Sequence, residues 1–157
     1  MATKAVYAGS FDPFTNGHLD IVRKAANLFG EVHVVVAANA GKRRTFSSFE
    51  MCRAISQTVK SEKLDNVRVC VCDGLVGDYA REIGAQYLVR GLRNQVDFGY
   101  EENIAEVNKL VYPELETVYL RADNSVISSS MVRELRSYGK DVSKFLPVAV
   151  LRSLTGG

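Results

Sequence analysis

The sequence predicts an α/β fold, namely a doubly wound sheet of five parallel strands with helices on both faces, in a single domain that covers residues 1–157. Two observations predict it. Short apolar runs alternate with segments of helical periodicity along the chain, which is the pattern of a parallel sheet with right-handed crossovers. A length of 157 residues with 46% hydrophobic content fits one domain with a substantial core.

The expected strands are short and largely apolar. They are Lys4–Ala8, Val32–Ala37, Val67–Cys72, Tyr87–Val89 and Thr117–Leu120. The second is an almost uninterrupted apolar run, which is typical of a strand buried on both faces.

The expected helices follow the strands after short connections. They are His18–Phe29, Ser47–Glu62, Gly77–Ile83, Phe98–Val111, Ser129–Ser137 and Lys144–Leu154. Gly30 and Gly84 mark two of the helix ends. Ser47 and Glu50 match a capping box, and Pro147 is expected in or near the first turn of the last helix. This order of elements predicts a Rossmann-like sheet, which binds ligands beyond the carboxyl ends of its strands.

Composition narrows the classes of function. Net charge is +2 with acids and bases interspersed, which argues against a dedicated nucleic-acid-binding protein. The exception is Lys42-Arg43-Arg44, either a solvated loop or a phosphate-binding segment. No targeting segment and no apolar run of about 20 residues is present, so we expect a cytoplasmic protein without a membrane partner. The three cysteines are expected to be reduced, small buried side chains, and no metal site of the protein is expected.

The segment Gly9–His18 joins the first strand to the first helix. A glycine-bearing turn before a helix offers free N–H groups and the positive end of the helix dipole to an anion. His18 on the first helical turn and Ser10 after the strand would present an imidazole and a hydroxyl to the same phosphate. Asp12, before Pro13, is expected to shape the turn.

Three further polar blocks follow other strands at the same edge of the sheet: Asn39–Arg44, Leu88–Asn94 and Val126–Ser130. Arg90 leaves an apolar strand, so it needs either a bound anion or a structural carboxylate. Ser128-Ser129-Ser130 opens a helix, as an ordinary cap or as a second anion site.

With these four blocks in order, the chain resembles the bacterial phosphopantetheine adenylyltransferases. Thr15-Asn16-Gly17-His18 resembles the T/HxGH signature of the nucleotidyltransferase superfamily, Arg90–Arg93 the RGLR motif and Ile127–Ser130 the ISSS block. The resemblance implies adenylyl transfer from ATP to 4′-phosphopantetheine by direct attack, giving dephospho-coenzyme A and pyrophosphate. It also implies Mg²⁺ bound with ATP, inhibition by coenzyme A and a homohexamer. Ser10 stands where many members have Thr, and it keeps the hydroxyl.

The resemblance also assigns site residues. Catalytic residues would be Ser10, His18, Lys42 and Arg90, and Ser10, Lys42, Val76 and Arg90 would bind the acceptor. ATP would be bound by Ser10, Phe11, His18, Gly91, Leu92, Arg93, Glu101, Asn124, Ser125, Val126, Ile127, Ser128, Ser129 and Ser130.

Two other interpretations stay open. Nicotinate mononucleotide adenylyltransferases and glycerol-phosphate cytidylyltransferases share the T/HxGH turn but use other acceptors. A non-catalytic nucleotide or coenzyme A sensor is a further possibility, because a fold does not fix a function. The Arg-Gly-Leu-Arg block and the short chain favour the pantetheine enzyme.

Overall fold

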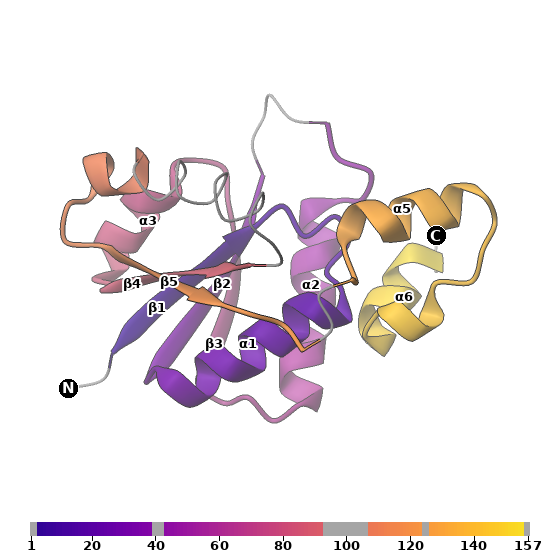
Figure 1. Cartoon of the computed structure of the whole chain (residues 1–157), viewed down its shortest axis with the longest axis horizontal. Coiled ribbons are helices and arrows are strands. Elements are labelled where there is room, and N and C mark those ends of the chain that lie inside the picture. Colours follow the sequence, from indigo (N-terminus) through magenta and orange to yellow (C-terminus); the bar gives the residue numbers. More distant parts are fainter. Residues whose placement is uncertain (1–2, 39–42, 93–106, 124–125, 156–157) are drawn as a thin grey trace.

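Five strands form one sheet in the computed structural model, which describes residues 3–38, 43–92, 107–123 and 126–155 (Figure 1). They are β1 (Lys4–Gly9), β2 (Glu31–Ala37), β3 (Val67–Cys72), β4 (Tyr87–Gly91) and β5 (Glu116–Leu120). All neighbours are parallel, and the strand order is β3-β2-β1-β4-β5. The predicted sheet is confirmed.

The strand order reverses beside β1. The chain moves outward from β1 to β2 and β3, then returns to place β4 on the other side of β1. The carboxyl ends of β1 and β4 therefore lie side by side at the switch point of the sheet, where open α/β sheets bind ligands. The turn after Gly9 and the side chain of Arg90 both belong to this edge.

The helices are α1 (Asn16–Leu28), α2 (Ser48–Ser61), α3 (Val76–Ile83), α5 (Ser129–Ser137) and α6 (Val148–Thr155). Residues 107–111 are also helical. The Ser47 hydroxyl accepts the Glu50 N–H at the start of α2, which is one of the two hydrogen bonds of the predicted capping box. Gly84 ends α3 in the left-handed conformation, as predicted. No helix in the described parts of the chain is long and apolar enough to cross a membrane.

The predicted boundaries of α2 and α3 differ from the structure by one residue at one or both ends, and two other helix predictions are wrong by more. The first helix begins at Asn16 rather than His18, because Thr15 caps it. The last predicted helix is two elements, the 3₁₀ helix η1 (Ser143–Phe145) and then α6. Pro147 disfavours helical backbone at Leu146, which is extended with φ −124° and ψ 144°.

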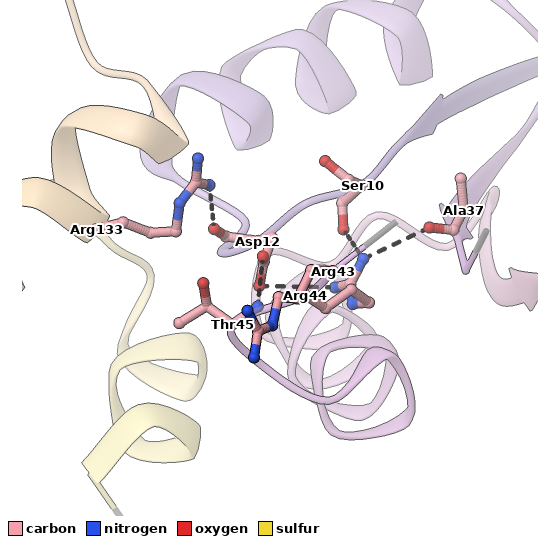
Figure 2. Close-up of a pocket in the computed structure, with 7 residues that line it drawn as sticks. All are labelled: Ser10, Asp12, Ala37, Arg43, Arg44, Thr45 and Arg133. Atoms are coloured by element: carbon pink, nitrogen blue, oxygen red, sulfur yellow. Dashed lines mark hydrogen bonds and ion pairs between the residues drawn. The ribbon is translucent and has the colours of Figure 1, made fainter. Parts of the chain in front are cut away.

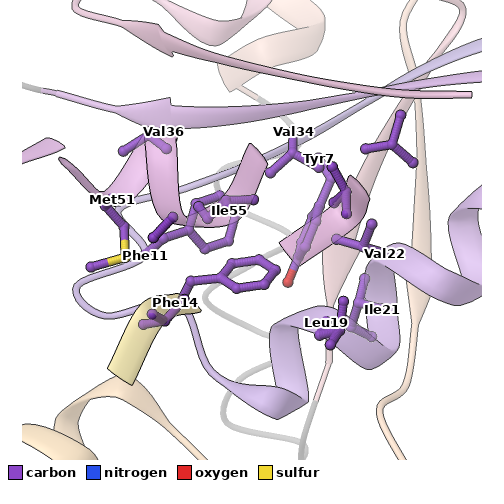
Figure 3. Packing of buried hydrophobic residues seen from close by; sticks show 14 of the residues in the cluster. Tyr7, Phe11, Phe14, Leu19, Ile21, Val22, Val34, Val36, Met51 and Ile55 are labelled. Atoms are coloured by element: carbon purple, nitrogen blue, oxygen red, sulfur yellow. The ribbon is translucent and has the colours of Figure 1, made fainter. Parts of the chain in front are cut away.

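Alternating strand side chains build a core on each face of the sheet. Tyr7 and Val34 face the larger core, where Phe14 from the turn before α1 and Met51 and Ile55 from α2 pack against them (Figure 3). Val6, Val35 and Leu88 face a smaller core closed by Ala80 of α3 and by Leu115. Helices therefore cover both faces, as predicted.

The cysteines depart in part from prediction. All three are free thiols, but they are half-buried rather than fully buried. Cys70 donates to the Tyr79 hydroxyl at 3.2 Å, and this hydroxyl also lies 3.0 Å from His33 Nδ1. Burial, followed by the Cys70 hydrogen bond, raises the pKa of Tyr79. His33 Nε2 in turn lies 2.8 Å from Glu31 Oε2, so the hydrogen-bonded series runs from Cys70 through Tyr79 and His33 to Glu31. His33 is thus a structural residue of β2.

Candidate active site

The turn between β1 and α1 is fixed by its aromatic side chains. Phe11 has a φ of 45°, in the left-handed region that a bulky residue rarely adopts. Its ring is buried and packs edge-on against Tyr7 and Phe14, both with centroids at 5.3 Å. A Cβ at Gly9 would lie only 3.0 Å from this ring, so a larger residue there would have to displace it. The Phe11 side chain belongs to the core and is not available to a ligand.

His18 is held by a capping box at the start of α1. The Thr15 hydroxyl accepts the His18 N–H at 3.3 Å, and His18 Nδ1 accepts the Thr15 N–H at 2.9 Å. The imidazole also stacks on Phe14 and meets the edge of Phe11, with ring centroids at 5.5 and 5.0 Å. Histidine thus stands at the position that Glu or Gln usually takes in this motif.

The capping box fixes the tautomer of His18. A backbone N–H can only donate, so Nδ1 must act as an acceptor, and the neutral ring carries its proton on Nε2. Nε2 is then the ring nitrogen that remains free to act as a donor towards a ligand, and the capping box holds it in one orientation on the first turn of α1. Such a preorganised donor can stabilise charge that develops on a phosphate oxygen.

The block Ile127–Ser130 packs directly on this turn. A Cβ at Gly17 would lie 3.3 Å from the Ile127 carbonyl oxygen, so glycine allows the two segments to approach closely. The Ser129 hydroxyl donates to the Pro13 carbonyl at 2.7 Å. These contacts join residues more than 100 positions apart and bring the two predicted phosphate-binding segments together.

The serines of this block have different tasks. The Ser128 hydroxyl caps α5 by accepting the Met131 N–H at 3.1 Å, and the Ser129 hydroxyl is engaged by Pro13. Ser130 is exposed. The main-chain N–H groups of Ser129 and Ser130 occupy the first two helical positions, where an α-helix supplies no partner of its own from within. An anion here would be bound mainly by main-chain N–H groups and the helix dipole.

A polar cavity of about 150 Å³ lies beside Ser10, between the turn after β1 and the segment after β2 (Figure 2). It has room for a phosphate group, since a water occupies about 30 Å³. Its charged lining is three guanidinium groups and one carboxylate, from Arg43, Arg44, Arg133 and Asp12. The surplus of positive charge suits an anion.

Arg44 and Asp12 form the wall of this cavity. Arg44 donates to the carbonyl oxygens of Ser10 at 2.6 Å and Phe46 at 3.0 Å. The Asp12 carboxylate accepts the N–H groups of Thr45 and Phe46, both at 2.8 Å. Asp12 therefore shapes the backbone as predicted, and it does so across 33 residues of sequence. Arg44 is therefore a structural residue. It is not a solvated loop side chain, and ligand binding is not its only role.

Arg90 lies at the switch point. Its guanidinium is half-buried, and Nη1 donates to the Ala8 carbonyl of the neighbouring strand at 3.2 Å. Leu92 continues the pairing beyond β4 by donating to the Leu120 carbonyl at 3.0 Å. A Cβ at Gly91 would meet Tyr7 and Ile21 at ordinary contact distances of 3.8 Å.

Val76 and Val126 are the remaining predicted site residues that the structure describes. Val76 is the first residue of α3 and packs at the margin of the smaller core, next to the exposed Leu75. Val126 is exposed. Five predicted site residues lie outside the described residues: Lys42, Arg93, Glu101, Asn124 and Ser125. Within the described residues, no three carboxylate, histidine or cysteine side chains gather as metal ligands.

Arg133 carried no prediction from the sequence, and the structural contacts of Thr15 and Arg44 were not predicted either. Thr15 could have been found, because Thr-x-x-His follows the spacing of a capping box. Arg133 donates to the Asp12 carbonyl at 2.7 Å from α5, and Arg44 contacts Ser10. Neither arginine has a local sequence signal for these contacts, because each partner is remote in sequence.

Comparisons with known proteins agree with this geometry. Residues 6–135 match the cytidylyltransferase-like family. The chain is 46% identical over 153 residues to a phosphopantetheine adenylyltransferase of Lacticaseibacillus paracasei, covering 96% of this chain and 90% of the relative. It is 48% identical over 151 residues to the enzyme of that name from Heliobacterium modesticaldum, covering 95% of this chain and 89% of the relative.

A solved structure superposes on nearly the whole of this chain. A crystal structure from Vibrio parahaemolyticus, described as a nicotinate-nucleotide adenylyltransferase, superposes with a TM-score of 0.73. The match covers 99% of this chain and 93% of the other at 16% sequence identity. At that identity the likeness bears on the fold alone.

Proposed function

The chain belongs to the phosphopantetheine adenylyltransferase family, and from this membership we propose that it transfers the adenylyl group of ATP to 4′-phosphopantetheine. A phosphate oxygen of 4′-phosphopantetheine attacks the α-phosphorus of ATP. The bond from this phosphorus to the bridging oxygen of pyrophosphate breaks, and dephospho-coenzyme A and pyrophosphate leave. The protein is thus a transferase of coenzyme A biosynthesis.

One observation carries the assignment of the reaction to this site. The first turn of α1, with Nε2 of His18 as a fixed donor, is docked on the start of α5 through Gly17, Ile127 and Ser129. This pairing supports binding one polyphosphate chain between a histidine and a helix N-terminus. His18 would donate to the α-phosphate, and the Ser129 and Ser130 N–H groups would hold the β- and γ-phosphates.

The acceptor phosphate is proposed to lie on the other side of His18. Ser10, Lys42 and Arg90 would bind it, as the family resemblance implies. Of these three, Ser10 lines the cationic cavity, whose arginines are Arg43, Arg44 and Arg133. A phosphate nucleophile is already ionised near neutral pH, so the reaction needs no strong general base. Catalysis then consists of positioning and charge stabilisation. Arg93 would join the triphosphate site, and Val76 would contact the pantetheine arm.

Mg²⁺ is proposed to enter with ATP and to bridge its phosphates, which would neutralise their charge. We also propose a cytoplasmic location, a homohexamer and inhibition by coenzyme A, each from membership of the family. A single domain over residues 1–157 is part of the same proposal.

The reaction is tested by incubating the chain with ATP, Mg²⁺ and 4′-phosphopantetheine and measuring dephospho-coenzyme A by mass spectrometry. Nicotinate mononucleotide and, with CTP, glycerol phosphate are the control acceptors. We expect product with 4′-phosphopantetheine only. Turnover of another acceptor would reassign the substrate, and ATP binding without any turnover would identify a sensor.

A further inference from the structure

Asp20 and Lys24, one turn apart on α1, hold the chain where it leaves β5. Lys24 Nζ donates to the Arg121 carbonyl and, at 2.8 Å, to the Asp123 carboxylate. Asp20 Oδ2 accepts the Asp123 N–H at 2.5 Å and lies 3.6 Å from Lys24 Nζ. Two of these contacts are made to the main chain, so they fix the backbone at residues 121 and 123.

Asp20 and Lys24 together form a clamp on residues 121 and 123. The helix that carries this clamp also carries His18, the proposed catalytic residue. Asp20 lies two residues after His18, and the chain beyond Asp123 leads to Ile127 and Ser129, which contact Gly17 and Pro13. Residues 121 and 123 are therefore attached to α1, and Ile127 and Ser129 contact its first turn and the turn before it. The position of the Ser128–Ser130 helix start relative to His18 depends on both attachments.

We propose that Asp20 and Lys24 are positioning residues for the nucleotide, which set the triphosphate-binding segment 126–130 against His18. The proposal rests on the proposed function. Without the clamp, this segment must be ordered when ATP binds, and the lost chain entropy reduces the binding free energy. The acceptor site is built from other segments, so the effect should fall on ATP and not on 4′-phosphopantetheine.

The clamp acts through its main-chain hydrogen bonds more than through its ion pair. The Asp123 side chain is 84% exposed, and an exposed ion pair contributes little. Charge-assisted hydrogen bonds from Lys24 and Asp20 to the backbone are stronger. The hydrogen bond to Asp123 raises the pKa of Lys24, which keeps the amine charged at any pH suited to an assay. Replacing Asp123 should thus matter less than replacing Asp20 or Lys24.

The test compares Lys24→Met and Asp20→Ala with two controls. Arg23→Met removes a neighbouring cation of the same helix, whose partner Glu62 lies just after α2. Lys24→Arg keeps the charge and the donors. We expect Lys24→Met and Asp20→Ala to raise the KM for ATP, and the Kd for MgATP measured by calorimetry, by about three- to tenfold, because part of the binding free energy is then used to order residues 126–130.

The KM for 4′-phosphopantetheine should change less than about twofold in the same variants, since twofold is only ~0.4 kcal/mol. Arg23→Met and Asp123→Ala should resemble the wild type, and Lys24→Arg should restore ATP affinity. Equal rises in both KM values, an unchanged ATP affinity, or the same rise in Arg23→Met would overturn the proposal.

Hydrogen–deuterium exchange gives a readout that does not depend on turnover. The peptide that contains residues 121–128 should exchange faster in Lys24→Met and Asp20→Ala than in Arg23→Met, and unchanged exchange would refute the clamp. If the wild type makes no dephospho-coenzyme A but binds MgATP, the proposed reaction fails and the Kd values still decide the clamp. A wild type that does not bind MgATP overturns both.

Discussion

Replacing His18 by Asn separates its role in capping α1 from its proposed role as a donor to the α-phosphate. The Asn side-chain oxygen can accept the Thr15 N–H that His18 Nδ1 accepts at 2.9 Å, so the cap of α1 is retained. Asn has no atom at the position of Nε2, so the donor to the α-phosphate is lost. His18→Ala is the less informative variant, because it removes the cap and the donor together.

The expected loss of catalytic rate follows from the removal of one donor. One preorganised transition-state donor contributes about 3–4 kcal/mol, so kcat for His18→Asn should fall about 10²–10³-fold. Because this interaction strengthens in the transition state, kcat and kcat/KM should fall together. Loss of ring contacts with Phe11 and Phe14 should destabilise the fold by about 1–3 kcal/mol, or about 2–12 °C in Tm.

The assay is initial-rate pyrophosphate release with both substrates saturating, at a temperature well below the Tm of each variant. His18→Gln is the matched variant, because its longer amide can place an N–H near the position of Nε2. It should be at least about tenfold faster than His18→Asn, a difference of ~1.4 kcal/mol. Turnover of His18→Asn within about fivefold of wild type, or ~1 kcal/mol, would refute a catalytic role for His18.

Three other changes have defined outcomes. Arg90→Gln should raise the KM for 4′-phosphopantetheine at least about tenfold through loss of a charge-assisted hydrogen bond, with the KM for ATP little changed; a rise for ATP alone would exchange the two assignments. Asp12→Ala should lower the free energy of unfolding by about 1–3 kcal/mol in a denaturant titration, because two half-buried N–H groups lose their acceptor; a change under about 0.5 kcal/mol would contradict its structural role. Hydrogen bonding to His33 lowers the pKa of Glu31 from its usual 4.5, so Glu31 stabilises the fold above pH 4.5, and this contribution disappears as the pH falls through the lowered value. The Tm difference between wild type and Glu31→Gln should accordingly be constant from pH 7 to about 5 and shrink below pH 4.5, and a gap that persists to pH 3 would contradict this.

The sheet was predictable because its evidence is local. Val32–Ala37 is apolar except for His33, and such a run in a strand–helix alternation indicates a central parallel strand. The end of α3 at Gly84 and the start of α2 at Ser47 also follow from single residues. The helix start at Ser129 was predicted at the correct residue for the same reason.

The details of the site were less predictable, because they depend on contacts between remote segments. Asp12 could be assigned to the turn, but its partners Thr45 and Phe46 lie 33 and 34 residues away. The motif resemblance indicated that Ser129 is a site residue, yet only the packing of α5 on Pro13 shows that its hydroxyl is engaged within the protein. The clamp of Asp20 and Lys24 on residues 121–123 spans about 100 residues and leaves no pattern in the sequence.

The central claim is that His18 and the start of α5 bind one triphosphate. A crystal structure with Mg²⁺ and the non-reactive analogue α,β-methylene ATP tests it most directly. We expect an α-phosphate oxygen at about 2.7–3.2 Å from His18 Nε2, and β- or γ-phosphate oxygens at similar distances from the Ser129 and Ser130 N–H groups. A triphosphate bound away from the start of α5, or an imidazole whose Nε2 contacts no phosphate, would contradict it.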